Sequence, residues 1–385
     1  MASRIVVAGS VAQRYGRGGH TWVFLQYLLG FRQLGYDVLF VDRLEPEMCV
    51  DQSGELCPVD KSGNLSYLLD VLRTFGLERN FAILCDGGTH VIGMSRAQLI
   101  DWVKSSALLL NVMGFLNDEE ILSQAPHRVL LDIDPGFGQI WQAAGLHELF
   151  RAHDRYVTIG ENIGRPDCAI PGCGQEWVTT PQPVVLEHWP KQPARGTKFT
   201  TVASWRGPFA PLEFHGQTFG LRVHEFRKFL DLPKVTGHEF ELALDIDAAD
   251  HSDLAALKAS NWQLADPGTV AADPIRYQQF IQESKAEFMV AKNMYVQSAS
   301  GWMSDRSICY LASGKPVLAQ DTGIGYRYPV GAGLLTFTTL EEAAAGVEEI
   351  CADYDHHARA ARDLAEAYFD SRLVLSRLLD RLGVA

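Results

Sequence analysis

The segment at residues 298–307 carries the densest set of side chains suited to ligand binding, and it reads Ser-Ala-Ser-Gly-Trp-Met-Ser-Asp-Arg-Ser. The planar guanidinium of Arg306 matches the oxygens of a phosphate group. Gly301 would let the backbone approach a ligand, and Ser304 or Asp305 could cap the helix that follows. The free N–H groups of that helix start would face an anion. Further hydroxyls come from Ser300 and Ser307. The segment predicts an anion site; the alternative is a plain helix cap with a surface arginine.

A second polar group, Gln320-Asp321-Thr322-Gly323, directly follows an apolar run at residues 316–319. Ligands of open parallel sheets collect at the carboxyl ends of the strands, so this tetrad is expected to contact a hydroxyl-rich ligand. The alternative is a tight turn in which Asp321 bonds its own backbone.

The loop at residues 10–19 connects the first expected strand to the first expected helix. It is rich in glycine, contains Arg14 and Arg17, and ends at His20. A histidine with an unperturbed pKa of ~6.5 could act as a general base, although a locally hydrogen-bonded histidine is the commoner outcome. The loop lacks both the G-x-G-x-x-G and the G-x-x-x-x-G-K-[ST] pattern, which argues against a nicotinamide enzyme and a P-loop ATPase.

Acidic residues follow other expected strands. Asp132 and Asp134 could hold a divalent metal through oxygen, but the sequence Asp-Pro-Gly favours a turn there. Asp86 and His90 come after another strand and are expected to face the same edge of the sheet. Near residue 220, helical spacing puts Arg222 and Glu225 on one side, and a solvated helix face explains this pair nearly as well. His215 and His224 lie nearby.

The elements that position these residues alternate between short apolar runs and longer helical patterns. Continuous apolar runs of this length are typical of strands buried in a parallel sheet. In the first half the runs lie at residues 5–8, 38–41, 81–85, 107–112, 129–133 and 156–159. In the second half they lie at residues 199–203, 240–244, 287–291, 316–319 and 334–337. Helices are expected at residues 21–34, 220–230, 274–284, 308–313, 340–351 and, as a long tail, 356–382.

The alternation predicts an α/β protein with two Rossmann-like domains. Residues 161–198 are crowded with proline and glycine and are expected to connect the domains, with one last strand at 184–186. We expect an N-terminal domain at residues 1–185, a second domain at 186–355 and a C-terminal helix at 356–385.

Composition narrows the class of protein. The 385 residues are 47% hydrophobic and 21% charged, which excludes a mainly disordered chain. The net charge of −13 argues against nucleic acid as a partner. The seven cysteines include no C-x-x-C pair, which argues against a zinc site and favours a reducing compartment. No apolar run is long enough to span a membrane or to form a signal-peptide core, so we expect a soluble, cytoplasmic protein.

Three motifs resemble those of GT-B glycosyltransferases, in particular the bacterial family-1-type and spore-coat CgeB-like enzymes. They are residues 300–307, the segment Tyr-Leu-Ala-Ser-Gly-Lys-Pro-Val at 310–317, and Gln-Asp-Thr-Gly at 320–323, supported by Gly-Gly-His at 18–20. The resemblance implies two facing domains and a C-terminal helix that crosses back to the first. It also implies a metal-independent hexosyltransferase that uses a UDP- or dTDP-linked sugar, with no further cofactor.

The resemblance also implies roles for individual residues. The donor diphosphate would lie at the helix start, residues 304–307, aided by Arg206 and Lys292. His20 would deprotonate the acceptor, and Gln320 and Asp321 would contact the sugar, Asp321 as a second catalytic residue. The other donor-binding residues would be Gly18, Gly19, Ser300, Gly301, Thr322 and Gly323. The acceptor would be bound by Asp86, His90 and Asp134.

The chain departs from the family pattern in two places. Gly301 and Cys309 stand where many retaining enzymes carry a pair of glutamates, and Gly301-Trp302-Met303 replaces the His-Gly-Gly of inverting enzymes. The stereochemical outcome, the sugar, the acceptor, and the choice between monomer and homodimer stay open. Two alternatives also remain: a sugar-nucleotide epimerase using Asp86, Asp134 and His224, and a non-catalytic nucleotide-sugar-binding protein.

Overall fold

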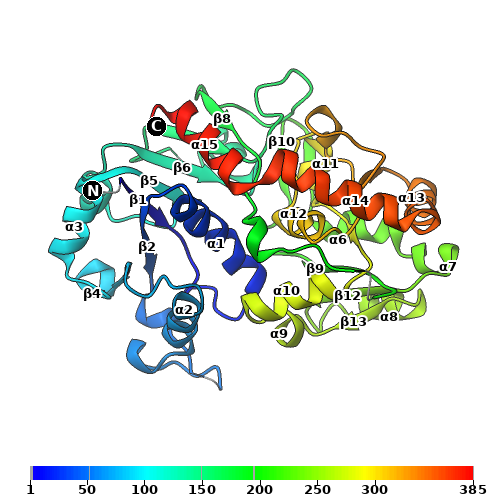
Figure 1. Ribbon diagram of the computed structural model, residues 1–385, viewed down its shortest axis with the longest axis horizontal. Helices are drawn as coiled ribbons and strands as arrows, with labels where there is room; N and C mark the ends of the chain where they lie inside the picture. Colours follow the sequence, from blue (N-terminus) through cyan, green and yellow to red (C-terminus); the bar gives the residue numbers. More distant parts are fainter. Residues whose placement is uncertain (1–2, 52, 149, 194–195, 385) are drawn as a thin grey trace.

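Two sheets, each covered by helices, make up the protein (Figure 1). The computed structural model describes residues 3–51, 53–148, 150–193 and 196–384. The N-terminal lobe holds an eight-stranded sheet in the order β4-β3-β2-β1-β5-β6-β7-β8. It is parallel except for β4, which pairs antiparallel with β3. Its strands are β1 (Arg4–Ala8), β2 (Asp37–Arg43), β3 (Phe81–Cys85), β4 (His90–Ile92), β5 (Ser106–Val112), β6 (Arg128–Asp132), β7 (Arg155–Thr158) and β8 (Trp177–Thr179).

The C-terminal lobe holds a six-stranded parallel sheet in the order β13-β12-β9-β14-β15-β16. Its strands are β9 (Phe199–Ser204), β12 (Phe240–Asp245), β13 (Gln263–Ala265), β14 (Ala286–Met289), β15 (Val317–Gln320) and β16 (Leu334–Phe337). A separate hairpin consists of β10 (Leu212–Phe214) and β11 (Gln217–Phe219). Each lobe therefore has the Rossmann-like architecture that the apolar runs predict.

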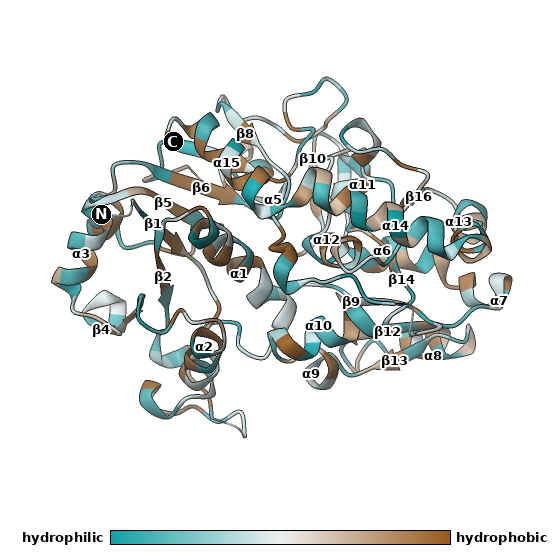
Figure 2. Ribbon diagram, in the orientation of Figure 1, coloured by the Kyte–Doolittle hydropathy of each residue, from teal (hydrophilic) through white to brown (hydrophobic). Residues whose placement is uncertain are grey.

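Helices cover the faces of both sheets. Those of the N-terminal lobe are α1 (Gly18–Gln33), α2 (Gly63–Thr74), α3 (Arg96–Lys104), α4 (Glu119–Leu122) and α5 (Phe137–Ala143). Those of the C-terminal lobe are α6 (Arg222–Phe226), α7 (Leu232–Thr236), α8 (His251–Ala259), α9 (Pro267–Val270), α10 (Pro274–Glu283), α11 (Asn293–Gln297), α12 (Asp305–Ala312) and α13 (Leu340–Ala352). Hydrophobic residues concentrate in strands such as β6, whereas the helices carry both kinds (Figure 2).

The C-terminal tail crosses from one lobe to the other, as expected (Figure 1). It consists of α14 (Tyr354–Leu364), a π-helical turn (Ala365–Phe369) and α15 (Ser371–Leu382). The helix α14 packs against α12 in the C-terminal lobe, and α15 packs against α1 in the N-terminal lobe. The backbone of Val184 is bonded to the tail at Phe369 and Ser371 where the helix changes direction.

Some elements differ from the sequence-based expectation. The run at 184–186 forms no sheet strand: Val184 makes an isolated bridge with Asp370, and a 3-10 turn (Leu186–His188) follows. The helix expected at 220–230 is α6 followed by a 3-10 turn (Arg227–Phe229). The short edge strands β4, β8 and β13 carry no long apolar run, so the sequence pattern did not indicate them.

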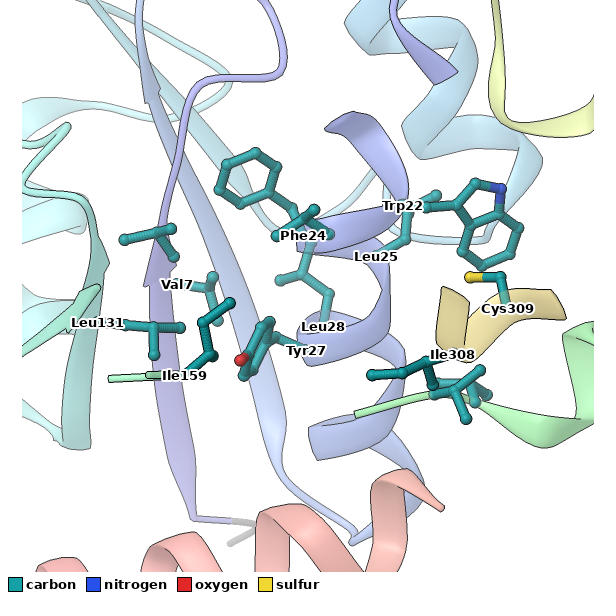
Figure 3. Close-up of a cluster of buried hydrophobic side chains, with 14 of the residues drawn as sticks. Val7, Trp22, Phe24, Leu25, Tyr27, Leu28, Leu131, Ile159, Ile308 and Cys309 are labelled. Atoms are coloured by element: carbon teal, nitrogen blue, oxygen red, sulfur yellow. The ribbon is translucent and has the colours of Figure 1, made fainter. Parts of the chain in front are cut away.

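The helix α1 lies between the two lobes. Figure 3 shows Tyr27 and Leu28 turned toward Ile159 of the N-terminal lobe, while Trp22 and Leu25 lie near Ile308 and Cys309 of α12. These side chains belong to one buried cluster that continues through both lobes. The apolar face of α1 thus joins the lobes beside the cleft.

Candidate active site

A cleft between the lobes holds two adjoining cavities, of about 560 and 620 Å³. The first lies between the loop at 15–20 and the carboxyl ends of β6, β9 and β14, where parallel sheets present their ligand-binding edge. The second lies beside it, toward the loop at 204–208. Both cavities are lined by Tyr15, Arg17, Ser204 and Asp245.

Arg222 is the side chain best placed to bind an anion in the first cavity. It begins α6, and its guanidinium donates to the carbonyl oxygens of Val290 (3.0 Å) and Ser204 (3.0 Å). Burial, aided by the charge of the nearby Arg306, lowers the pKa of Arg222 to about 10. Among the described residues, no carboxylate lies within ion-pair distance of Arg222. Its charge is therefore available to a ligand.

Arg306 reaches the same cavity but already has a partner. Its Nε donates to Glu287 at 2.5 Å, and a second nitrogen donates to the carbonyl oxygen of Val202 at 2.7 Å. Burial alone would lower the pKa of Arg306, but the neighbouring Glu287 carboxylate raises it, so the guanidinium stays charged. The buried Glu287 thereby fixes the direction in which Arg306 points.

The start of α12 lies on the cavity wall through Ser304, Asp305 and Arg306. The Ser304 side chain makes no capping hydrogen bond. Burial raises the pKa of Asp305, although Arg306 and the backbone N–H groups of residues 305 and 306 favour its ionised form. Asp305 therefore offers an acceptor for a ligand hydroxyl, and the positive charge for a phosphate comes from the arginines instead.

Lys292, Asp134 and Tyr295 connect the lobes across the first cavity. The ammonium group of Lys292 lies 2.5 Å from the carboxylate of Asp134, and the hydroxyl of Tyr295 donates to the other oxygen. Burial lowers the pKa of Lys292, and the Asp134 carboxylate opposes that effect. Tyr295 also stacks on Trp302 with ring centroids 4.3 Å apart. The cavity therefore has a polar surface, made by Lys292 and Asp134, next to the stacked aromatic rings of Tyr295 and Trp302.

His20 lies on the opposite wall, at the start of α1. Its Nε2 is 2.9 Å from the hydroxyl and 3.2 Å from the carbonyl oxygen of Ser10, so that nitrogen carries the proton. The rings of Phe24 and Phe115 lie near the imidazole. Burial, aided by the charge of Arg14, lowers the pKa of His20 to about 3. The imidazole is neutral near pH 7 and is a weak proton acceptor.

Gly18 and Gly19 also line this cavity, and packing explains why glycine stands there. A Cβ on Gly18 would lie 2.2 Å from the carbonyl oxygen of Asp273, and one on Gly19 would lie 2.7 Å from the ring of Tyr277. The N–H of Gly18 donates to the carbonyl oxygen of Ala271. The two glycines thus let the start of α1 touch the C-terminal lobe.

Several other residues predicted to bind the donor lie outside both cavities, at a contact between the lobes. The amide of Asn162 donates to the carbonyl oxygens of Ala299 and Gly323, each at 3.0 Å, and its backbone N–H donates to Ser300. A Cβ on Gly301 would lie 2.7 Å from Asn162. The hydroxyl of Thr322 donates to the carbonyl oxygen of Trp302. This contact between the lobes lies next to Trp302 and holds its backbone in place beside the first cavity.

The remaining predicted residues are spread more widely. Gln320 is buried and donates to Glu225, while Asp321 accepts from the N–H of Gly323 at 2.8 Å, the tight-turn alternative. Arg206 lines the second cavity and pairs with Asp250 at 2.5 Å. Ser307 is buried in α12. Neither Asp86 nor His90 lines either cavity.

Among the residues that line the two cavities, Arg222, Tyr295 and Arg14 have side chains suited to ligand binding but received no role from the sequence. For Arg222 the sequence left a functional pair with Glu225 and a solvated helix face as alternatives, and Tyr295 belongs to no motif. Arg14, whose guanidinium lies 5.8 Å from the ring of Phe115, lines the second cavity. The sequence offers one signal for Arg222, which begins a helix two residues after Gly220 in the second α/β domain.

Within the described part of the chain, no group of three or more His, Cys, Asp or Glu side chains is arranged to hold a metal ion. All seven cysteines are free thiols. None of the helices described is both long and apolar enough to cross a bilayer.

Two facing Rossmann-like lobes, a ligand-sized cleft between them and a tail that crosses back define the GT-B fold of glycosyltransferases. The chain has this fold. No protein-family model and no curated protein matches its sequence.

Solved structures match over the whole chain. An α-glucosyltransferase in complex with UDP and a 13-mer DNA matches with a TM-score of 0.59, at 10% identity over 100% of both chains. Anabaena Alr3699/HepE in complex with UDP and glucose matches with a TM-score of 0.57, at 10% identity over 100% of both chains. Sucrose-phosphate synthase from Thermosynechococcus elongatus matches with a TM-score of 0.54, at 12% identity over 99% of each chain.

Proposed function

We propose that the protein is a glycosyltransferase that moves a sugar from a UDP- or dTDP-linked donor to a nucleophile on a separate acceptor. The observation that carries the proposal is Arg222, a cationic side chain without a carboxylate partner among the described residues, aimed into the cleft by two backbone carbonyl groups. A donor diphosphate supplies the missing negative charge. The likeness of the fold to UDP complexes supports the choice of a nucleotide sugar.

Three cations would share the charge that develops on the leaving diphosphate. Arg222 and Arg306 lie on the C-terminal side of the first cavity, and Lys292 lies beside them at the end of β14. Preorganised cations of this kind stabilise a leaving phosphate without reorganising during the reaction. Because they can neutralise the diphosphate, we propose a metal-independent reaction, which predicts unchanged turnover in the presence of a chelator.

The acidic groups of the cavity would orient the sugars. Asp305 and Asp134 present carboxylates on two sides of the space, and Asp134 belongs to the N-terminal lobe, where the acceptor is proposed to bind. His20 offers a neutral imidazole near the same space, and its low basicity favours hydrogen bonding to a hydroxyl over complete proton removal.

Calorimetric titration with UDP, dTDP, GDP and NAD tests the donor site. We expect one pyrimidine nucleoside diphosphate to bind, and Arg222→Gln to weaken its binding by roughly tenfold or more, since a charged hydrogen bond to a phosphate contributes ~1.5–3 kcal/mol. The matched control is Arg359→Gln, which removes an exposed arginine from α14. Binding of NAD alone, or equal affinity in both variants, would contradict the proposal.

Product analysis then tests the reaction class. A transferase releases the nucleoside diphosphate and needs an acceptor or water, whereas an epimerase converts the donor sugar by itself. Conversion of the donor without release of the diphosphate would indicate the epimerase, and tight binding without turnover over a broad acceptor panel would indicate a binding protein.

A further inference from the structure

A third cavity, of about 180 Å³, lies where both lobes meet the C-terminal tail. Its walls come from the loop after β7, the end of β8, the residue Arg327 of the C-terminal lobe and one face of α15. It shares no lining residue with either cavity of the cleft. It is therefore a separate hollow on the molecule.

Three arginines surround this cavity: Arg327, Arg377 and Arg381. Arg327 donates to the carbonyl oxygen of Glu161, and Arg381 donates to that of Thr179. Both bonds are to backbone carbonyl groups and neutralise neither guanidinium, although the Glu161 carboxyl group attracts both charges. In the described part of the chain, none of the three forms an ion pair with a carboxylate.

The three arginines are exposed side chains whose mutual repulsion is small, and an anion between them would relieve it. Arg377 and Arg381 are four residues apart on α15, so they lie on one face of the helix and repel each other. The chain as a whole has a net charge of −13 and thus many carboxylates that could pair with arginine. A concentration of unpaired guanidinium groups around a hollow is typical of sites for phosphate.

Glu161 is the acidic residue in the cavity wall. It is 8% exposed, and the hydroxyl of Tyr328 donates to its carboxyl group. Burial raises the pKa of Glu161, against the effects of Tyr328, Arg327 and Arg381. One carboxyl group held in this way does not balance three guanidinium groups, so the cavity keeps a positive charge.

We propose that this cavity binds the phosphoryl group of a small metabolite, at a site distinct from the donor cleft. A water molecule occupies ~30 Å³ in the liquid, so the volume suits a phosphoryl group and a few further atoms. The guanidinium groups of Arg377 and Arg381 would bind its oxygens from the tail, and Arg327 would bind them from the C-terminal lobe.

The position of the site connects it to the arrangement of the lobes. Glu161 precedes Asn162, whose side chain bonds the C-terminal lobe at Ala299 and Gly323. Arg327 follows Gly323 by one short 3-10 turn (Ile324–Tyr326). A bound phosphoryl group would therefore hold together three segments that meet at the junction, and it would slow their local opening.

Hydrogen exchange with inorganic phosphate as the probe tests the proposal. We expect phosphate to slow exchange in residues 323–328 and 371–382 of the full-length protein, compared with potassium chloride at equal ionic strength. In Arg377→Gln, the phosphate concentration that gives half of the maximal slowing of exchange should rise roughly tenfold or more, because a charged contact to the anion is lost. Arg377 makes no hydrogen bond or ion pair with another described residue, so we expect its substitution to leave the unfolding temperature without phosphate unchanged.

Two further variants locate the bound anion. Arg222→Gln removes a cation from the cleft and Arg359→Gln removes an exposed arginine from α14; both should keep the wild-type phosphate dependence at the junction. The proposal is overturned by equal phosphate dependence in Arg377→Gln and wild type, by equal protection in chloride, or by protection that disappears only in Arg222→Gln. This test does not depend on the proposed sugar transfer.

Discussion

At the scale of single residues, the cleft separates side chains by their environment as well as by their type. Arg222 and Arg306 are both arginines on one cavity wall, yet Arg306 is paired with Glu287 and Arg222 is held by backbone carbonyl groups alone. Of these two arginines, only Arg222 has no ion-pair partner among the described residues. His20 shows the same principle, because the apolar rings and Arg14 around it keep the imidazole neutral.

Because His20 is neutral in the folded protein, the free energy of unfolding is expected to fall at acidic pH. Its pKa is about 3 in the folded protein and 6.5 in an unfolded chain, so the unfolded state binds a proton first as the pH falls. Stability is therefore lost progressively below pH 6.5. Between pH 7 and pH 5 this amounts to about 2 kcal/mol. We expect His20→Gln to lose correspondingly less stability over that interval than the wild type.

Urea unfolding at the two pH values measures this difference. Buried carboxylic acids such as Asp42 and Asp132, whose pKa values burial raises to about 7 and about 6, titrate in both proteins and cancel in the comparison. Identical pH dependence in the variant and the wild type would mean that His20 is solvated and available as a base.

At the scale of elements, the sequence pattern predicts what lies inside the sheets better than what lies at their edges. The long apolar runs of both halves correspond to strands, because strands buried on both faces need an unbroken run. The three-residue strands β4, β8 and β13 have one neighbour each and too few residues to form a pattern. The break of the tail at residues 365–370 lies where the tail contacts Val184, which is remote in sequence.

The residues of the candidate site could also be predicted only in part. The expectation that strand ends and helix starts gather at one edge correctly brings His20, Asp134, Lys292 and Asp305 to one cavity. It does not indicate that the loop carrying Asn162 covers Gly301 and Gly323, since that loop comes from the other lobe. Sequence spacing within one domain holds no information about such a contact.

The start of α1 gives an element-scale prediction. Alanine ordinarily stabilises a helix relative to glycine, but a Cβ on Gly18 would lie 2.2 Å from the backbone oxygen of Asp273. We expect Gly18→Ala to lower the free energy of unfolding by about 1–3 kcal/mol, because the backbone of the other lobe must move. Gly172→Ala is the matched control, since among the described residues no atom beyond its chain neighbours lies within 4 Å of the added Cβ. Chemical denaturation of both variants measures the effect; a Gly18→Ala protein as stable as the control would show that the lobes move apart freely.

At the scale of the whole molecule, the lobes are joined by an apolar interior rather than by a flexible linker. Trp22 of α1 is 1% exposed, packs against Trp189 with the two rings tilted, and donates its indole N–H to the carbonyl oxygen of Pro274 at 2.8 Å. The buried cluster around it continues from β1 through α12 to α15. Interfaces between domains of one chain are usually more polar than this and allow independent movement.

This shared interior predicts that the two lobes unfold together. Hydrogen exchange in increasing urea, followed separately in β5 and β6 and in β14 and β15, should give one midpoint for both sheets. Trp22→Ala should lower both midpoints equally, which corresponds to a loss of about 3–5 kcal/mol in the free energy of unfolding, the range for a buried tryptophan.

The decisive variant is Trp102→Ala, which alters α3 at the far edge of the N-terminal lobe, where Trp102 packs under Arg4. If the lobes are coupled, this smaller destabilisation must move the midpoint of the C-terminal sheet as well, although no contact there has changed. A shift confined to the N-terminal sheet would mean that the lobes unfold separately and that the cluster around α1 does not couple them.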